Sequence, residues 1–510
     1  MPTSNKTGTS RLAVFRVDAS PNIGTGHAMR SLTLAGGLAA SGWRIAFAVA
    51  HGTARSAPSI ASSGYSLLTL ERSGLSEAAA LAEHWPEGAQ LLVVDSYSHD
   101  ARFETACRPW ADRILVIDDL ADRPHDADIL LDPTPCRAHS DYASLLKRKC
   151  TLLLGPAYAL LSPCFSERRA ASLARRSDRQ SPARILVAFG GSDPRNATSL
   201  VLRGLDTLDR RLEMDVVLGA AAAHRQAVLD LAKSCRVPVS VSVDLQPETM
   251  ADLLARADMA FGSIGTSMWE RCCLGVPSVV ITTAANQHPI ADILQRLEAI
   301  RYVGEIGEIG EADVAREARA LSAAPSTTSE IGKRAAALCD GRGVYRVTAA
   351  VDPPLAKDGK PIMLRPATES DCALLLEWQR HPRLRVYAKN PAAPSEGEHR
   401  AWLAARLADN DCLLNIVLHG ECPVGAVRLD REMDPERGEL YEISIYVTPD
   451  RQRRGIATGA LAATRMLVPE DNLKAVVLPG NEASEALFRK AGYIWDDGFF
   501  VNPARRRLKA

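Results

Sequence analysis

The chain has 510 residues, more than a single hydrophobic core accommodates, so roughly two to four domains are expected. Lys and Arg together number 61, Asp and Glu also number 61, and no long run of one charge occurs, which argues against nucleic-acid or polybasic membrane binding. The eleven cysteines include no Cys-x-x-Cys pair and no stretch is long and apolar enough to span a bilayer, so a cytoplasmic protein without a structural zinc site is expected.

Short apolar segments alternate with helical segments from residue 11 to about residue 165. Continuous apolar strands that alternate with helices are typical of a parallel sheet covered on both faces. We therefore expect a Rossmann-like N-terminal lobe over residues 11–165. Its predicted strands cover residues 12–17, 44–49, 67–70, 90–95, 113–118, 128–131 and 151–154, and predicted helices at 27–40 and 76–85 lie between them.

A glycine-containing turn follows the first predicted strand and opens a helix. Gly24 and Gly26 let the main chain approach a ligand closely, and His27 lies on the first turn of the helix. The positive end of the helix dipole disfavours a charged histidine there, so we expect a neutral imidazole that can take a proton from water. The alternative is a capping loop with an incidental histidine.

Acidic residues stand at the ends of two further predicted strands of this lobe. Asp95 ends one strand and precedes Tyr97, while Asp118 and Asp119 end another. Folds of this kind place ligands just past the carboxyl ends of parallel strands, so these side chains are candidates for a site. Helix capping is the alternative, and for Asp118 and Asp119 it is the favoured one.

A second alternation covers residues 184–345, after a polar and basic segment, residues 166–183, that indicates a solvated linker or a surface helix. Two small-residue loops, at 190–198 and 262–270, each lie between a strand and a helix, and their free N–H groups suit phosphates. Glu270 suits ribose hydroxyls, the alternative being a solvated helix residue. Two doubly wound Rossmann-type lobes predict a GT-B-like α/β architecture with the nucleotide held by the second lobe.

Residues 342–360 interrupt the alternation and mark the boundary to a third, α+β domain over residues 361–508. Within it, an apolar strand ends shortly before the pattern Gln452-x-x-Gly455-x-Ala457, which opens a helix. Main-chain amides and arginines at a helix N-terminus form an anion site. A basic helix start that merely contacts solvent is the alternative.

Several motifs together resemble known families. In the first two lobes they are, in order, Arg16-x-Asp18 with Gly24-Thr-Gly-His27-x-x-Arg30, Gly190-Gly-Ser-Asp193, Gly265-Thr-Ser-Met-Trp-Glu270-Arg and Asn286-Gln287. Through them, the region from about 11 to 345 resembles the UDP-sugar hydrolases of the pseudaminic acid pathway and their spore-coat polysaccharide relatives. Through Gln452-x-x-Gly455-x-Ala457 and Asn481-x-x-Ser484, the region from about 361 to 505 resembles GNAT N-acetyltransferases. Trp378 and His399-x-x-Trp402 resemble the branch that acetylates nucleotide-linked 4-amino sugars.

For the first unit, the resemblance implies hydrolysis of UDP-2,4-diacetamido-2,4,6-trideoxy-β-L-altropyranose to UDP and free sugar. His27 would position or deprotonate the water that attacks the anomeric carbon, without a metal, and Asp18 and Tyr97 are candidates for orienting sugar or water. The residues expected to bind the UDP-sugar are Asn22, Gly24, Gly26, Arg30, Gly191, Ser192, Gly265, Thr266, Glu270, Asn286 and Gln287.

For the third domain, the resemblance implies N-acetylation of the 4-amino group of the precursor UDP-4-amino sugar by acetyl-CoA, so the first unit would use the product of the third domain. A strand bulge near residues 443–446 would polarise the thioester. Many GNATs carry a tyrosine that protonates the leaving thiolate, and Phe488 stands at that place here. Tyr493 is expected in the core. Glu442 or a bound water is the candidate base. The residues expected to bind acetyl-CoA are Gln452, Arg453, Arg454, Gly455, Ile456, Ala457 and Asn481.

Two other function classes remain open for the first unit. A GT-B glycosyltransferase would pass the sugar to an acceptor, and a nucleotide-sugar binding module would not react at all; either would be fused to a GNAT domain of other amine specificity. No nucleic-acid or membrane partner is expected, and further enzymes of the nonulosonic acid pathway are candidate partners.

Overall fold

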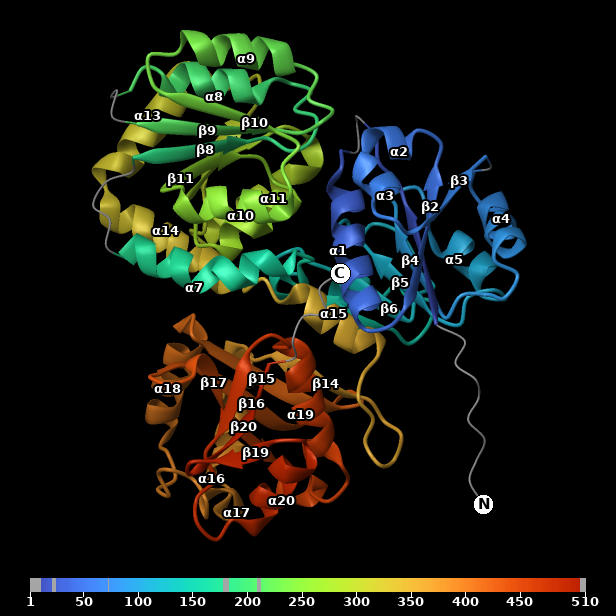
Figure 1. Ribbon diagram of the computed structural model, residues 1–510, viewed down its shortest axis with the longest axis vertical. Helices are drawn as coiled ribbons and strands as arrows, with labels where there is room; N and C mark the ends of the chain where they lie inside the picture. The colour runs from blue at the N-terminus through green and yellow to red at the C-terminus, as the bar shows by residue number, and fades with distance from the viewer. Residues whose placement is uncertain (1–10, 21–23, 72, 178–182, 209–211, 505–510) are drawn as a thin grey trace. The chain divides into compact units, whose positions relative to one another are not determined.

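The computed structural model describes residues 11–20, 24–71, 73–177, 183–208 and 212–504 (Figure 1). Asn22, one of the residues expected to bind substrate, lies outside the described residues. Contacts divide the chain into two compact units, Met1–Val344 and Tyr345–Ala510. The first unit contains two parallel sheets and the second contains one mixed sheet.

The first sheet has the strand order β3-β2-β1-β4-β5-β6-β7, and all its neighbouring strands are parallel. The order reverses between β1 and β4, so the loops that follow these two strands open at one place on the carboxyl edge of the sheet. The strands are β1 (Leu12–Val17), β2 (Arg44–Ala50), β3 (Ser66–Leu70), β4 (Leu91–Asp95), β5 (Ile114–Ile117), β6 (Ile129–Asp132) and β7 (Thr151–Leu154).

Helices cover both faces of this sheet, which explains why its central strands are buried along their whole length (Figure 1). The predicted strands and the two predicted helices are present, within one or two residues of the predicted ends. The helices are α1 (Gly26–Ala40), α2 (Thr53–Ser56), α3 (Pro58–Ser62), α4 (Ser76–His84), α5 (Ala101–Cys107), α6 (His139–Tyr142) and the 3₁₀ helix η1 (Pro156–Tyr158).

The second sheet repeats this plan, with the order β10-β9-β8-β11-β12-β13 and parallel pairing throughout. The two doubly wound sheets confirm the predicted GT-B-like architecture. The last strand, β13, was not predicted from the sequence. The strands are β8 (Arg184–Ala188), β9 (Glu213–Leu218), β10 (Val239–Val243), β11 (Met259–Gly262), β12 (Ser278–Thr282) and β13 (Arg301–Glu305).

The helical elements of this part of the chain start with one in the segment that joins the two lobes and end with one that follows the second lobe. They are α7 (Pro163–Ser177), α8 (Ala197–Leu205), α9 (Arg225–Ser234), α10 (Pro247–Arg256), α11 (Thr266–Cys273), η2 (Ala285–Gln287), α12 (His288–Arg296), α13 (Glu311–Ala323), α14 (Pro325–Leu338) and α15 (Gly343–Val351). The division between the two compact units falls after Val344, inside α15 and inside the segment 342–360 predicted as a domain boundary.

Helix α7 matches the surface-helix alternative predicted for residues 166–183 as far as Ser177, but not all of its basic side chains face solvent; residues 178–182 lie outside the described residues. Arg169 is buried, and its guanidinium donates to the carbonyl oxygens of Cys273, Cys339 and Ala336. Phe165, assigned to the first lobe from the sequence, packs in the hydrophobic core of the second lobe. The basic residues of α7 therefore hold helix ends of the second lobe, since guanidinium groups are suited to capping several carbonyl oxygens at once.

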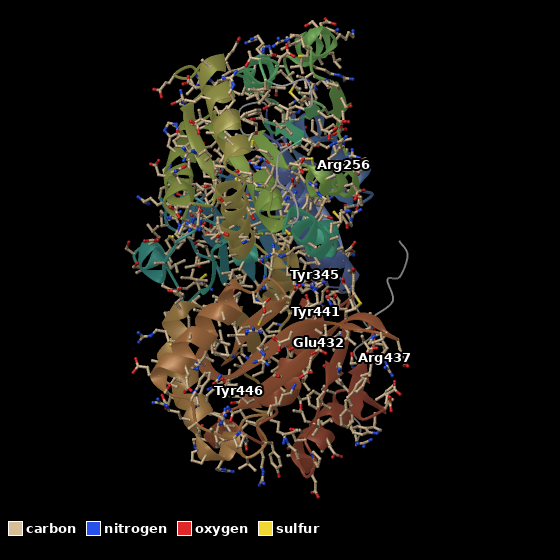
Figure 2. The ribbon with its side chains drawn as sticks, turned by 90° about the vertical axis from the view of Figure 1, so that its left-hand side faces the viewer. Arg256, Tyr345, Glu432, Arg437, Tyr441 and Tyr446 are labelled. Carbon is tan, nitrogen blue, oxygen red and sulfur yellow. The ribbon has the colours of Figure 1, made fainter. Side chains whose placement is uncertain are left out.

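The third sheet is mixed, with the order β14-β15-β16-β17-β18-β20-β19. Strands β14 to β17 are antiparallel neighbours and β17 is parallel to β18. Figure 2 shows Tyr441 and Tyr446 well apart along β17. The strands are β14 (Ile362–Pro366), β15 (Cys412–His419), β16 (Cys422–Asp434), β17 (Gly438–Val447), β18 (Asn472–Ala475), β19 (Ile494–Asp496) and β20 (Phe499–Asn502).

The predicted bulge near residues 443–446 is absent, because β16 and β17 pair in one unbroken register from Asp434↔Gly438 to Gly425↔Val447. The sheet departs from regularity on the other side of β17, where pairing with β18 ends at Glu442↔Lys474. The helical elements are η3 (Glu369–Asp371), α16 (Cys372–Arg380), α17 (Pro382–Arg385), α18 (Glu396–Ala408), η4 (Pro449–Arg451), α19 (Ile456–Leu467) and α20 (Glu482–Lys490).

Candidate functional site

His27 lies at the start of α1 and is bound to a carboxylate at the end of β4. Its Nδ1 lies 2.5 Å from Oδ1 of Asp95. Asp95 is fully buried and His27 is 6% exposed. A carboxylate on Nδ1 favours the tautomer that carries its proton there, which leaves Nε2 as the basic nitrogen. Nε2 has no hydrogen-bond partner among the described residues.

Arg30, one helical turn after His27, holds the same carboxylate from a second side. Its Nε donates to Oδ2 of Asp95 at 2.8 Å and its Nη2 to Oδ1 at 2.6 Å. The hydroxyl of Ser31 also donates to Oδ2, at 3.1 Å. Burial alone would raise the pKa of Asp95, but the charges and hydrogen bonds of Arg30 and His27 hold it well below its ordinary value. Asp95 is therefore a fixed anion that orients the imidazole.

Tyr97 contacts the opposite side of His27. The two rings meet edge to face, with centroids 4.6 Å apart. The Tyr97 hydroxyl donates to Asp119 at 2.9 Å, and Asp119 accepts from Arg30, also at 2.9 Å. Burial and the Asp119 charge raise the pKa of Tyr97 well above its ordinary value. Tyr97 therefore keeps its proton near neutral pH, and its ring lies against the imidazole of His27.

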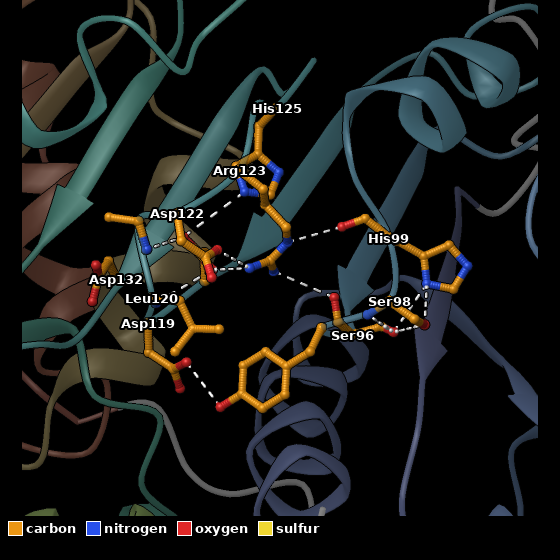
Figure 3. Close-up of polar contacts among 12 residues, drawn as sticks. Ser96, Ser98, His99, Asp119, Leu120, Asp122, Arg123, His125 and Asp132 are labelled. Atoms are coloured by element: carbon orange, nitrogen blue, oxygen red, sulfur yellow. Dashed lines mark hydrogen bonds and ion pairs between the residues drawn. The ribbon is translucent and has the colours of Figure 1, made fainter. Parts of the chain in front are cut away.

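The loop that carries Tyr97 is itself fixed by Arg123. The Arg123 guanidinium donates to the carbonyl oxygens of His99 at 3.0 Å and Ser96 at 3.4 Å (Figure 3). It also pairs with the buried Asp118 at 3.0 Å. Asp118 also accepts from the main-chain amides of Leu120 and Ala121, so it holds this loop. In the described chain no helix begins between β5 and β6, so the helix-capping interpretation of Asp118 and Asp119 is wrong.

Asp18 belongs to a neighbouring network and makes no hydrogen bond or ion pair with His27. It accepts from Arg16 at 2.6 Å and from the Ser96 hydroxyl at 2.7 Å. Arg16 also donates to Glu77 at 2.5 Å, and Glu77 lies 3.1 Å from His99. Burial would raise the pKa of Glu77, but hydrogen bonds from His99 and Arg16 lower it to about 2. The structure thus brings Tyr97 and Arg30 to His27 and assigns Asp18 to the support beneath them.

The two glycines of the first motif occupy positions that restrict side chains. Gly24 has a φ of +82°, a conformation that L side chains rarely adopt. A Cβ added at Gly26 would lie 3.3 Å from the hydroxyl of Thr266, which begins α11 in the second lobe. The start of α1 therefore lies close to the start of α11 within the first unit.

Gly191 and Ser192 lie in the first loop of the second lobe. A Cβ added at Gly191 would meet the Thr25 hydroxyl at 2.6 Å, so only glycine fits this approach. The carboxylate of Asp193 accepts from the amides of Ala197 at 2.9 Å and Thr198 at 3.0 Å. Asp193 therefore caps α8 and shapes the loop.

Gly265 and Thr266 open α11, and Glu270 follows one turn later. Glu270 is partly buried, and its carboxylate makes no hydrogen bond or ion pair to any described residue. Burial raises the pKa of Glu270 to about 7 against a smaller opposing effect of Arg271. A carboxylate left in this state accepts hydrogen bonds from a ligand without giving up partners in the protein.

Arg271 is a buried cation that the sequence did not single out. It is fully buried, and its Nη2 donates to the carbonyl oxygen of Ser263 at 2.7 Å. Burial lowers its pKa to about 10. No carboxylate among the described residues forms an ion pair with it. It places positive charge directly beneath the loop that precedes α11.

Asn286 and Gln287 form the 3₁₀ turn after β12. The side-chain oxygen of Gln287 accepts from the amide of Thr283 at 2.9 Å, so Gln287 closes the turn. Asn286 is exposed. Asn286 is thus available to a ligand, while the Gln287 oxygen already has a partner.

In the second unit, the residues expected to bind acetyl-CoA form the turn between β17 and α19. The Gln452 amide donates to the carbonyl oxygen of Val447 at 3.2 Å and fixes the turn. Arg453 has a φ of +64° and Gly455 a φ of +81°, and Gly455 caps α19. The first turn of a helix has main-chain N–H groups without partners inside the helix, so the amides of Arg454, Gly455, Ile456 and Ala457 suit an anion.

The second motif of this domain, Asn481-x-x-Ser484, lies at the start of α20. Asn481 caps α20 by accepting from the amide of Ser484 at 3.2 Å. Phe488 is buried at 4% exposure and meets Tyr493 edge to face, with centroids 5.0 Å apart. Tyr493 lies in the hydrophobic core, as expected.

Within the described parts of the chain, no group of three or more His, Cys, Asp or Glu side chains is placed to hold a metal ion. All eleven cysteines are free thiols. Among the helices that the structure describes, none combines the length and apolar character needed to cross a bilayer.

The sequence missed the residue that orients His27. Asp95 stands out in the sequence only as a strand-end acid, and the residues predicted to orient sugar or water beside His27 are Asp18 and Tyr97. The signal available was the strand order: in a doubly wound sheet, β4 lies beside β1, so the acid at its end faces the loop after β1. Arg271 ends the motif Gly265-Thr-Ser-Met-Trp-Glu270-Arg, but the sequence carries no signal of its burial, so no role was predicted for it.

Comparison with known proteins identifies relatives of this chain. The family model described as "Acetyltransferase (GNAT) domain" matches residues 362–494. The spore coat polysaccharide biosynthesis protein SpsG of Bacillus subtilis is 32% identical over 198 residues, which are 38% of this chain and 56% of that protein. The UDP-2,4-diacetamido-2,4,6-trideoxy-β-L-altropyranose hydrolase of Campylobacter jejuni is 23% identical over 284 residues, 56% of this chain and 96% of that enzyme.

For two of the curated relatives, SpsG among them, the aligned stretch spans only about half of the relative's own length, 51% and 56%. Among solved structures, that of MurG from Acinetobacter baumannii is 13% identical with a TM-score of 0.49, and the match covers 67% of this chain and 99% of that one. Homology to the hydrolase and to SpsG, together with the C-terminal GNAT domain, fits a fusion of a sugar-nucleotide enzyme with an acetyltransferase.

Proposed function

We propose that this chain, homologous to a UDP-sugar hydrolase and ending in a GNAT domain, is a bifunctional enzyme of pseudaminic acid biosynthesis. Its first unit hydrolyses UDP-2,4-diacetamido-2,4,6-trideoxy-β-L-altropyranose to UDP and free sugar. Its second unit acetylates the 4-amino group of the precursor UDP-4-amino sugar with acetyl-CoA. The observation that carries the first half is the His27–Asp95 pair, with Nε2 of the histidine left without a partner.

His27 acts as the general base in this proposal. Nε2 takes a proton from water as the water oxygen attacks the anomeric carbon, and the bond from that carbon to the UDP oxygen breaks. Asp95 stabilises the imidazolium that forms, and Arg30 keeps Asp95 ionised. A general base placed in this way typically contributes a factor of about 10² to 10⁴ in rate.

The second lobe holds UDP. Glu270 accepts hydrogen bonds from the ribose hydroxyls, Gly191 and Ser192 offer main-chain N–H groups, and the start of α11 with Arg271 beneath it stabilises the charge that develops on the departing diphosphate. The closeness of α1 and α11 supports an anomeric carbon between His27 and this diphosphate site.

The GNAT domain binds acetyl-CoA at the turn before α19. The amides of Arg453 to Ala457 hold the pyrophosphate, and Gln452 fixes the turn. Asn481, at the start of α20, is the further residue expected to bind acetyl-CoA. Its product would be the substrate of the first unit, so the fused halves would act on consecutive intermediates. Other enzymes of the nonulosonic acid pathway would then use the sugar that the first unit releases.

The decisive experiment supplies the synthetic diacetamido UDP-sugar and follows products by phosphorus NMR, with sugar detected separately. Release of UDP and free sugar in equal amounts is expected, and His27→Ala should reduce the rate by about 10² or more. Sugar transferred to an added acceptor would instead establish a glycosyltransferase, and binding without turnover a nucleotide-sugar binding module. A His27→Ala protein that releases UDP at the wild-type rate would refute the role of His27.

A further inference from the structure

The loop between α17 and α18 brings a lysine onto the central strand β17 of the GNAT domain. Nζ of Lys389 lies 2.6 Å from Oε1 of Glu442. The Glu442 side chain is 10% exposed, whereas the Lys389 side chain is 70% exposed. The amine therefore reaches a largely buried carboxylate from the solvent side, as the amine of an external substrate would.

The position of Lys389 is set by contacts on both sides of it in the loop. Arg385 donates to the carbonyl oxygens of Asn390 and, at 2.6 Å, Ala392, which closes the loop on itself. The hydroxyl of Tyr387 donates to the carbonyl oxygen of Gly480 at 2.9 Å, just before α20. The loop is thus anchored to the body of the domain, and the Lys389–Glu442 contact is part of this arrangement.

Glu442 stands at the point where β17 and β18 separate. It is the last residue of β17 paired with β18, opposite Lys474. Between there and Val447, that edge of β17 has no ladder partner in the described chain, and it leads toward the N-terminus of α19. A free strand edge beside a helix N-terminus suits an extended, amide-bearing arm that ends in a pyrophosphate, which is the chemistry of CoA.

With the pyrophosphate at α19, the thioester end of such an arm lies toward Glu442. The five residue steps from Glu442 to Val447 span roughly 17 Å of extended chain. Side chains alternate along β17, so Glu442 and Tyr446 share the face opposite to the core residues Ile443 and Val447. On that face the hydroxyl of Tyr446 is buried and has no hydrogen-bond partner in the described chain, so it is free to bond a polar group of a ligand.

We propose that Lys389 is an acceptor of the domain's own acetyl transfer and becomes acetylated in cis when acetyl-CoA binds. This inference rests on the acetyl-CoA-dependent half of the proposed function. The Lys389 ammonium gives a proton to Glu442, and the free amine attacks the acetyl carbonyl carbon. The new C–N bond forms as the C–S bond breaks, and the nitrogen loses its second proton, which passes through water to the departing CoA thiolate. Glu442 then releases the first proton to solvent and is again a carboxylate.

Acetylation changes the charge balance around Glu442. The amide that forms on Lys389 carries no charge, so the 2.6 Å ion pair with Glu442 is lost. The carboxylate is then released to receive the ammonium of an external amine. Self-acetylation would therefore prepare the site for its substrate and would leave a stable mark on one lysine.

The test incubates the full chain with acetyl-CoA alone and follows acetylation of individual lysines by peptide mass spectrometry. Lys389 should be modified at a rate independent of protein concentration and at least about tenfold faster than Lys474, as expected for a reaction within one molecule. Glu442→Gln should slow the modification at least tenfold. Glu432→Gln is the matched control, because it removes a carboxylate 3.3 Å from Lys474 on the same sheet; the rate of Lys389 acetylation should be unchanged in this variant.

Calorimetric titration with acetyl-CoA separates the two ways in which the test fails. Binding to wild type and to both variants shows that the proteins are folded, and an unmodified Lys389 in that case overturns the inference alone. Equal acetylation of Lys389 in wild type and Glu442→Gln also overturns it. Absence of acetyl-CoA binding to the wild-type chain would refute the acetyltransferase assignment and the inference together.

Discussion

The two lobes of the first unit treat their charged residues in opposite ways. In the first lobe, Asp95 and Glu77 are buried but each is bound by an arginine and lies beside a histidine, and the pKa of each carboxyl is lowered. In the second lobe, Glu270 and Arg271 are neighbours without an ion pair, and burial shifts each pKa toward the neutral form. The first lobe has completed its network before substrate binds, whereas the second retains unsatisfied groups.

This difference corresponds to two tasks. A general base needs fixed geometry, which a fully paired network provides. A nucleotide site needs donors and acceptors that are still available, and their desolvation is offset only when the ligand arrives. The contrast predicts that substitutions in the first lobe affect rate and folding, while those in the second affect affinity and can even increase stability.

Substituting Asp95→Asn tests the first half of the contrast and should have the largest effect. An amide favours the wrong tautomer of His27, so kcat for UDP release should fall by about 10² to 10⁴. The Kd for UDP, measured by calorimetry, should stay within about twofold. Ser31→Ala is the matched control, because it removes a hydrogen bond to Asp95 but keeps the carboxylate. Equal losses in both variants would contradict the orienting role.

Substituting Glu77→Gln should destabilise the first lobe by about 3 kcal/mol at neutral pH, because Arg16 and His99 lose a buried partner. The pKa of Glu77 is lowered from 4.5 to about 2, so its stabilisation is present above pH 4.5 and is lost as pH falls toward 2. The difference between variant and wild type should therefore vanish in acid. Hydrogen exchange of first-lobe peptides measures this difference in stability. A difference that persists at pH 2 would show that it does not come from the ionised Glu77 carboxylate.

Substituting Glu270→Gln should stabilise the second lobe, whereas Glu77→Gln destabilises the first. The pKa of Glu270 is raised from 4.5 to about 7, so ionisation costs native stability as pH rises through this window. The variant should be more stable than wild type by about 1–3 kcal/mol at pH 8 and equal at pH 4. Hydrogen exchange of second-lobe peptides, compared between variant and wild type from pH 4 to pH 8, measures this difference in stability. Equal stability of the two proteins at pH 8 would count against an unpaired carboxylate.

The same variant separates stability from binding. An ionised Glu270 accepts from the ribose hydroxyls, so wild-type affinity for UDP should increase as pH rises through 7 and should be roughly tenfold weaker in Glu270→Gln at pH 8. Calorimetry at several pH values, with the variant correcting for ionisation of UDP itself, provides the measurement. Identical pH profiles for the two proteins would remove Glu270 from the nucleotide site.

Much of the fold was predictable because the signals are local. Continuous apolar strands such as β1 and β4 follow from burial on both faces, and the helix after Gly24 follows from turn chemistry. Strand β13 escaped because it is short and only partly buried at the edge of its sheet. Helix α15 escaped because its flanking glycines and prolines indicate a linker.

The site was predictable by residue type but less so by pairing. His27 and Arg30 stand one turn apart in one motif, so the sequence displays them together. Asp95 lies 68 residues from His27 along the chain and meets it only through the adjacency of β1 and β4. The arginines of α7 likewise appear solvated in the sequence because their acceptors are main-chain carbonyl oxygens, which any residue supplies.

Substituting Tyr97→Phe should have the smallest effect and distinguishes positioning from catalysis. Phenylalanine keeps the ring against His27 and removes only the hydrogen bond to Asp119. A hydrogen bond to a carboxylate contributes about 1.5–3 kcal/mol, but this one reaches the reaction only through the position of the ring. We therefore expect kcat/KM to fall roughly 3- to 10-fold, with an unchanged pH profile. Since burial and Asp119 raise the Tyr97 pKa well above its ordinary value, no ionisation of this hydroxyl contributes near neutral pH. A loss of 10² or more, or a shifted alkaline limb, would make Tyr97 a proton donor and would mean that the first lobe contains a second catalytic group.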